Sequence, residues 1–94
     1  MQLTLPVLRI SRALLNARTK PVYGDGIAKA YKIKRWIAHE TLDRLERAGW
    51  ARSQFENIDP CLAGRRPRRL YELTPEGERL AREAWKLLDS TGTK

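Results

Sequence analysis

The sequence predicts a mostly α-helical domain with one small β hairpin, in the order helix, helix, helix, strand, strand, helix. Three observations support this class. Apolar residues recur at helical spacing in three stretches before residue 49 and in a fourth after residue 75. Two short stretches between them, residues 50–58 and 68–73, carry aromatic and branched apolar side chains and flank a loop with proline and glycine. A chain of 94 residues leaves room for a single domain, expected over residues 1–94.

The first helix is expected over residues 5–17. Thr4 can cap it, because a threonine hydroxyl accepts a hydrogen bond from the first turn, and Pro6 is tolerated there because a first-turn backbone needs no N–H donor. The apolar residues of this helix recur at helical spacing, which predicts one buried face. They are Val7, Ile10 and Leu14, with Leu3 before them and Leu8 and Leu15 beside them.

A second, shorter helix is expected to open within residues 22–25. In this helix Ile27, Ala30 and Tyr31 share a face, and lysines point away from it. Residues 32–34, Lys-Ile-Lys, are too few to hold another element, so they form a tight turn to the next helix.

The third helix is expected over residues 35–48, with Gly49 where a helix commonly ends on glycine. At 100° per residue its side chains separate into two faces. The outer face is unusual for a solvated helix, because it carries a large aromatic ring and a histidine near its start. The predicted buried face is Ile37, Thr41, Leu42, Leu45 and Ala48, and the outer face is Trp36, His39, Glu40, Asp43 and Arg47.

The second half of the chain predicts a hairpin and a final helix. Most of residues 50–58 forms the first strand, residues 57–67 form a long loop, and residues 68–73 form the returning strand. Thr74 then caps a helix over residues 75–90, and residues 91–94 are expected to fray. Three aromatic residues, Trp50, Phe55 and Tyr71, are expected to cover the core beneath the hairpin.

The charge balance favours a polyanionic partner. The chain has 19 Lys and Arg against 11 Asp and Glu, a formal charge of +8, which suits a nucleic acid or an acidic lipid surface. Arginines interrupt the apolar runs, which gives a membrane role little support. The single His39 and the single Cys61 provide no catalytic set, no metal or cofactor site and no disulfide, so a non-enzymatic protein of the reducing cytoplasm is expected.

Two helices joined by a tight turn, the second with polar and aromatic residues facing outward, are typical of a helix-turn-helix. A basic hairpin that follows can reach the neighbouring backbone or minor groove. Together they predict a winged helix-turn-helix, whose third helix enters the major groove of double-stranded DNA. Four arginines surround a proline in the wing, Arg65, Arg66, Arg68 and Arg69.

Three stretches resemble the PadR-like transcriptional regulators: Tyr23-Gly24 with residues 26–30, residues 42–50, and the wing with its helix start, residues 64–77. The resemblance implies a dimeric DNA-binding regulator, usually a repressor, confined to the cytoplasm at the nucleoid. The chain departs from the family's pattern on the third helix and the turn before it. Lys32 and Lys34 stand where small or capping residues are common, Trp36 where a small residue is usual, and His39 where tyrosine is usual.

The candidate DNA contacts divide into backbone and base contacts. Lys34, Arg44 and the wing arginines are expected to bind phosphates, although a solvated charge run is the alternative for the wing. If about five phosphates are neutralised per subunit, the slope of log K against log salt is about −4.5. Trp36 either folds back on the domain or contacts DNA, and Glu40 either accepts from cytosine or pairs with Arg44. The residues predicted to read bases are Arg35, Trp36, His39 and Glu40.

The last helix offers more apolar surface than one small domain can readily hide. We expect Leu80, Trp85 and Leu88 to form a homodimer contact there, with the core of the single domain as the alternative place for Trp85. The sequence therefore predicts a sequence-specific repressor that occludes a promoter. The alternatives are an architectural or accessory DNA-binding protein of a plasmid or phage, and a winged-helix module that binds RNA or docks on a protein.

Overall fold

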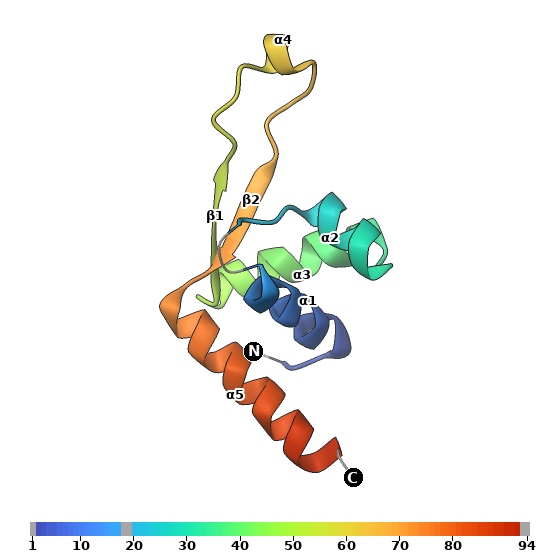
Figure 1. Cartoon of the computed structure of the whole chain (residues 1–94), viewed down its shortest axis with the longest axis vertical. Helices are drawn as coiled ribbons and strands as arrows, with labels where there is room; N and C mark the ends of the chain where they lie inside the picture. The colour runs from blue at the N-terminus through green and yellow to red at the C-terminus, as the bar shows by residue number, and fades with distance from the viewer. Residues whose placement is uncertain (1, 18–19, 93–94) are drawn as a thin grey trace.

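The computed structural model describes the backbone of residues 2–17 and 20–92, and the side chains of these ranges as far as residue 87. Three helices pack together, a hairpin rises beside them, and a long last helix runs away from the hairpin (Figure 1). The molecule is elongated, 52 by 26 by 21 Å. The elements are α1 Leu5–Asn16, α2 Gly24–Tyr31, α3 Arg35–Arg47, β1 Ala51–Phe55, α4 Pro60–Ala63, β2 Arg69–Leu73 and α5 Pro75–Gly92.

The N-terminal helix α1 forms as its cap predicts. The Thr4 hydroxyl accepts a hydrogen bond from the Val7 N–H at 3.4 Å, and a proline occupies the first turn. Buried side chains of α1 meet those of α2 and α3 in one core, and the largest fully buried ones are Val7, Ile10, Leu42 and Leu45. Ser11, also buried, donates to the Leu8 carbonyl at 3.0 Å, which satisfies its hydroxyl.

Helix α3 buries a face close to the predicted one. Thr41, Leu42 and Leu45 are buried as expected, and Ala38 joins them. The prediction was wrong for Ala48, which is exposed because the helix ends at Arg47 and the chain turns away at Gly49, whose φ is +84°. Ile37 is only half-buried. On α2, Ala30 is exposed where burial was predicted, while Ile27 is buried and Tyr31 half-buried.

The strands β1 and β2 form an antiparallel ladder from the pair Ala51 and Leu73 to the pair Phe55 and Arg69. The segment before α2 extends this ladder by one bridge, in which Val22 and Tyr71 exchange both backbone hydrogen bonds, at 2.9 and 2.6 Å. Tyr71 is buried beneath the hairpin, as is Trp50. The bridge therefore fixes the base of the hairpin against the start of α2.

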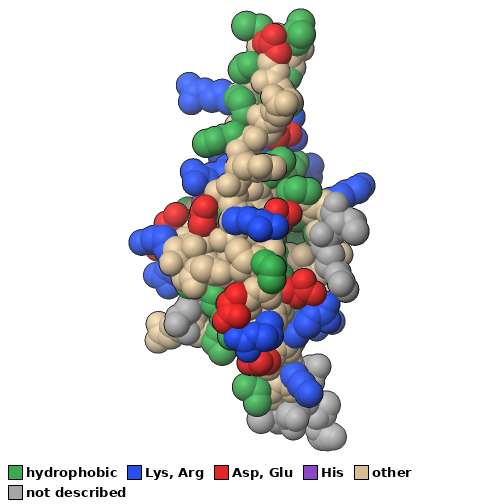
Figure 2. All heavy atoms as spheres, turned by 90° about the vertical axis from the view of Figure 1, so that its left-hand side faces the viewer, with side chains coloured by type: hydrophobic (Ala, Val, Ile, Leu, Met, Phe, Trp, Pro, Cys, Tyr) green, Lys and Arg blue, Asp and Glu red, His purple; other side chains and the backbone are tan. Residues whose placement is uncertain are grey.

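The far part of the hairpin differs from the prediction. The expected open loop contains a short helix, α4, which Asp59 caps by accepting the Cys61 N–H at 2.9 Å and which ends at Gly64 with φ +71°. At this tip, hydrophobic side chains and an acidic one face solvent, and Leu62 is 88% exposed (Figure 2). Phe55 was expected to cover the core but is 63% exposed, because the hairpin extends beyond the helices at that point.

Helix α5 begins at the predicted cap and packs on α1. Thr74 accepts the Gly77 N–H at 2.9 Å and donates to the Gly49 carbonyl at 2.7 Å. The helix continues to Gly92, so residues 91 and 92 are helical where fraying was predicted, and residues 93–94 lie outside the described range. No helix within the described residues is both long and apolar enough to cross a membrane.

Candidate nucleic-acid interface

The outer face of α3 carries the side chains predicted to read bases. The preceding turn is tight because Lys32 adopts the left-handed conformation, φ 55°, which ends α2, and α3 begins three residues later at Arg35. Lys34 occupies the N-cap of α3 and makes no side-chain capping bond. Trp36 is 64% exposed, so the indole faces solvent and does not fold back on the domain, and its contact with DNA stays a prediction.

An aspartate from α2, which the sequence reasoning did not single out, joins this face. One carboxylate oxygen of Asp25, Oδ1, accepts from Arg35 Nε at 2.9 Å and lies 2.8 Å from His39 Nε2. These hydrogen bonds, from His39 first and Arg35 second, lower the pKa of Asp25. Two predicted base-reading residues are thus held to one carboxylate of the neighbouring helix.

The same face shows a second carboxylate with a cationic partner. Glu40 Oε2 lies 3.7 Å from Arg44 Nη2, one helical turn further along α3. This is the ion pair at i and i+4 that the sequence offered as one alternative for Glu40. Both side chains are about half exposed, so the pair contributes little stability but offsets the charge of Arg44.

The wing is organised around Glu56, the residue after β1. Its carboxylate accepts from both terminal nitrogens of Arg65, at 2.6 and 3.2 Å, and from the Arg68 backbone N–H at 2.8 Å. These bonds, the Arg65 pair first, lower the pKa of Glu56 from about 4.5 to about 2. Arg65 therefore joins the two arms of the hairpin through its ion pair with Glu56, and it is also a candidate phosphate ligand.

The remaining wing arginines differ from one another. The Arg68 guanidinium lies over the Tyr23 ring, 4.3 Å from its centroid, which joins the wing to the start of α2. Arg69 donates to Ser53 Oγ at 2.9 Å and lies 3.6 Å from the Glu46 carboxylate of α3. Arg66 is exposed, and no described side chain pairs with it. The arginines are thus not a uniform solvated run.

Seven cationic side chains were predicted to contact DNA, and the structure separates them into two groups. Four have a carboxylate within 4 Å: Arg35 with Asp25, Arg44 with Glu40, Arg65 with Glu56 and Arg69 with Glu46. Figure 2, which shows the side of the molecule that lies at the left in Figure 1, also has acidic and basic side chains interspersed over the middle of the molecule. The three with no ion pair among the described residues are Lys34, Arg66 and Arg68.

The residues predicted for a dimer contact lie on α5. Trp85 is half-buried, and its indole N–H donates to the Leu8 carbonyl at 3.0 Å, while the Arg12 guanidinium lies 4.8 Å from the ring centroid. Leu80 packs against the core of the same chain. The Leu88 side chain lies outside the described residues. Trp85 therefore anchors α5 on α1, and the dimer contact stays a prediction.

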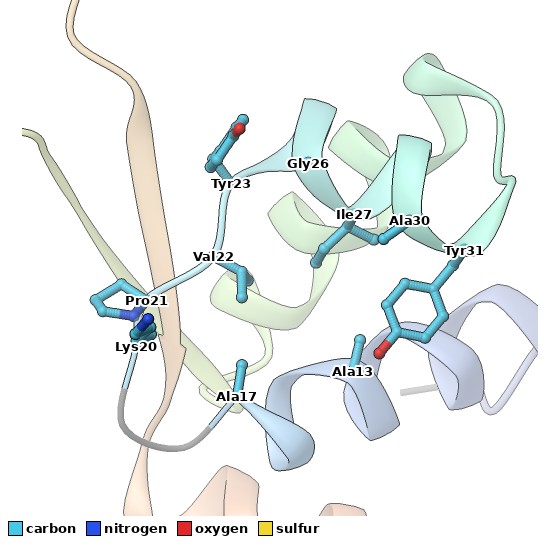
Figure 3. A pocket seen from close by; sticks show the side chains of 10 residues that line it. All are labelled: Ala13, Ala17, Lys20, Pro21, Val22, Tyr23, Gly26, Ile27, Ala30 and Tyr31. Carbon is cyan, nitrogen blue, oxygen red and sulfur yellow. The ribbon is translucent and has the colours of Figure 1, made fainter.

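A hollow of about 310 Å³ opens between α1, α2 and the segment that joins them (Figure 3). Its lining is almost entirely apolar, with Ala13 on one side and Ile27 and Tyr31 on the other. Tyr23, on its rim, is the residue that lies under Arg68 of the wing. None of the side chains predicted to contact DNA lines this hollow.

Two helices joined by a tight turn, a hairpin beside them and a helix after it define the winged helix-turn-helix fold. No protein-family model and no curated protein matches the sequence. Solved structures do match. A candidate DNA-binding protein of Ralstonia eutropha is similar over 89% of this chain and 99% of its own, at 23% identity and a TM-score of 0.68.

Two further structures are of regulators. A variant of MarR from Escherichia coli matches over 93% of this chain and 58% of its own, with 17% identity and a TM-score of 0.75. A variant of MepR from Staphylococcus aureus, bound to an oligodeoxyribonucleotide, matches over 98% and 67%, with 19% identity and a TM-score of 0.72. The chain thus spans under three fifths of the MarR length. The likeness establishes the fold, and the resemblance to PadR-like regulators stays a prediction.

Proposed function

We propose that this chain is a sequence-specific regulator of transcription that binds double-stranded DNA and represses by occluding a promoter. The observation that carries the proposal is the outer face of α3, where Trp36 is 64% exposed beside Arg35 and His39. An exposed tryptophan costs solvation in the free protein, and contact with a base edge or thymine methyl compensates for that cost.

The position of the wing supports the same function. The contact between Arg69 and Glu46 joins β2 to α3, and that between Arg68 and Tyr23 joins the hairpin to α2. A duplex that receives α3 in its major groove therefore meets the wing on its adjacent backbone. The unpaired cations Lys34 and Arg66 belong to these two elements and are suited to bind phosphates on either side of the groove.

We further propose that the protein acts as a homodimer of the PadR-like type. The 18-residue helix α5 extends away from the hairpin and the helices that carry the candidate DNA contacts (Figure 1). A dimer that binds DNA as helix-turn-helix dimers generally do would place its two copies of α3 on half-sites about one helical turn apart, roughly 34 Å. Leu80, Trp85 and Leu88 remain the proposed contact residues.

The proposal is tested by selecting binding sites from a random duplex library with the purified protein. We expect an enriched, roughly palindromic sequence, bound about 1,000-fold or more tightly than random duplex, with DNase protection of two half-sites. Sedimentation of the free protein at micromolar concentration checks the dimer. Equal competition by duplex RNA would overturn the DNA-binding proposal, and arrays of closely spaced protected sites would favour an architectural protein.

A further inference from the structure

The contact between α2 and α3 at Asp25 is built by two residues. Besides the two bonds to the carboxylate, the His39 ring lies flat against Gly24: a Cβ at that position would be 2.6 to 2.8 Å from three atoms of the ring. Any side chain larger than hydrogen at residue 24 would therefore move the imidazole. Gly24 thus leaves room for the His39 ring, and the adjacent Asp25 provides its hydrogen-bond acceptor.

The two partners on α3 lie four residues apart, so both project on one side of the helix near its start. Arg35 and His39 are 75% and 51% exposed, and Asp25 is 52% exposed, so the cluster is open to an approaching duplex. A carboxylate in this place has two effects. It fixes the directions of both side chains, and it offsets the attraction of Arg35 to phosphates in general.

We propose that Asp25, with Gly24 as its platform, determines specificity by positioning Arg35 and His39 for base contact and withholding them from non-matching DNA. This inference rests on the proposed function. A matching duplex offers base-edge acceptors to Arg35 and His39 that replace or complement the Asp25 carboxylate. A random duplex lacks these acceptors in the right places, so Arg35 stays paired with Asp25 as the duplex approaches. The cluster therefore lowers affinity for random sequence more than it lowers affinity for the matching one.

The test compares Asp25→Asn with wild type on two probes, the duplex enriched by the wild-type protein and a random-sequence duplex. Asparagine keeps the shape and one oxygen acceptor but removes the charge. We expect the salt slope on random duplex to steepen by about 0.9 per subunit, because Arg35 becomes free to bind one more phosphate. The affinity ratio, which is the affinity for the enriched duplex divided by that for the random duplex, should fall by about fivefold or more. This is the lower end of the discrimination that one specific base contact provides.

Two further variants make the test specific. Gly24→Ala keeps the carboxylate but displaces the imidazole, so it should also lower the affinity ratio. Glu83→Gln makes the same charge change on α5, where Glu83 pairs with Arg79 at 2.9 Å, and should leave the ratio unchanged. Asp25→Glu restores the charge and should recover part of the ratio, which a simple loss of folding would not show.

The free protein provides an independent readout, because His39 is the single histidine of the chain. At alkaline pH the ¹⁵N shifts of its ring should report a proton on Nε2, the nitrogen facing Asp25, and this preference should weaken in Asp25→Asn and Gly24→Ala. An unchanged affinity ratio in both variants would overturn the inference and leave DNA recognition standing. A wild-type protein that does not discriminate between the two probes would overturn both.

Discussion

Removing the Arg66 side chain should weaken binding to every duplex and flatten its dependence on salt. Arg66 is exposed on the arm of the hairpin that leads to β2, and no described carboxylate pairs with it. Arg66 can therefore bind a phosphate without first breaking an ion pair. The neighbouring Arg65, in contrast, is held by Glu56 at 2.6 Å.

The magnitude follows from the number of cations that lack an ion pair. Lys34, Arg66 and Arg68 give a slope of log K against log salt of about −2.7 per subunit, at about 0.9 for each phosphate. This is shallower than the value of about −4.5 that five contacts would give. Arg66→Ala should bring the slope to about −1.8. Between roughly 50 and 200 mM salt, the affinity of the wild type should therefore fall about 3.5-fold more than that of the variant.

Fluorescence anisotropy with a labelled random-sequence duplex measures these slopes directly. The control is Arg79→Ala, which makes the same change in net charge on α5, where Arg79 pairs with Glu76 and Glu83. We expect this control to keep the wild-type slope. An equal flattening in both variants would refute the reasoning, since net charge alone would then explain the effect. A wild-type slope near −4.5 would show that the paired arginines leave their carboxylates on binding.

Three further outcomes are expected. Gly77→Ala should lower the free energy of unfolding by about 3 kcal/mol in urea titrations, because its Cβ would lie 1.8 Å from the Trp50 carbonyl oxygen. The control Gly49→Ala adds a Cβ in open space at φ +84° and should cost only about 1–2 kcal/mol. Equal costs would contradict the argument that the backbone of Trp50 leaves no room for a side chain at residue 77. The folded-state pKa of Glu56 is lowered to about 2, so its stabilisation of the hairpin should be present above pH 4.5 and be lost as the pH falls toward 2. Amide exchange in the hairpin should show this loss in wild type but not in Glu56→Gln. Trp36→Ala should change stability by less than about 0.5 kcal/mol yet weaken DNA binding, and a larger loss of stability would mean that the indole is packed.

The fold was largely predictable because its elements are marked by local signals. Thr4 and Gly49 act as caps in the structure as the sequence indicated. The short helix α4 was missed although Asp59 before it and Gly64 after it are capping residues, because four residues are too few to show an apolar period. The two strands lie within the stretches predicted for them, since β1 covers residues 51–55 of 50–58 and β2 covers residues 69–73 of 68–73.

The site was less predictable because it depends on contacts between elements. The exposure of Phe55 could not be inferred from alternation: it lies on the same side of β1 as the buried Ala51, but the helices that cover that side do not extend so far. The ion pair of Arg44 and Glu40 was visible at i and i+4, whereas Asp25 lies ten and fourteen residues from its partners. Only the packing of α2 on α3 brings these groups together.

The carboxylates beside the candidate DNA contacts change how the net charge of +8 acts. Asp25, Glu40 and Glu46 each offset a cation that would otherwise attract any phosphate. On a non-matching duplex these acidic groups approach the DNA with nothing to replace their partners, which opposes binding. On a matching duplex, base edges and phosphates lie where they can bind these cations in place of the carboxylates. A strongly basic chain thereby limits its affinity for random DNA, and we expect neutralising any of the three carboxylates to raise that affinity and narrow discrimination.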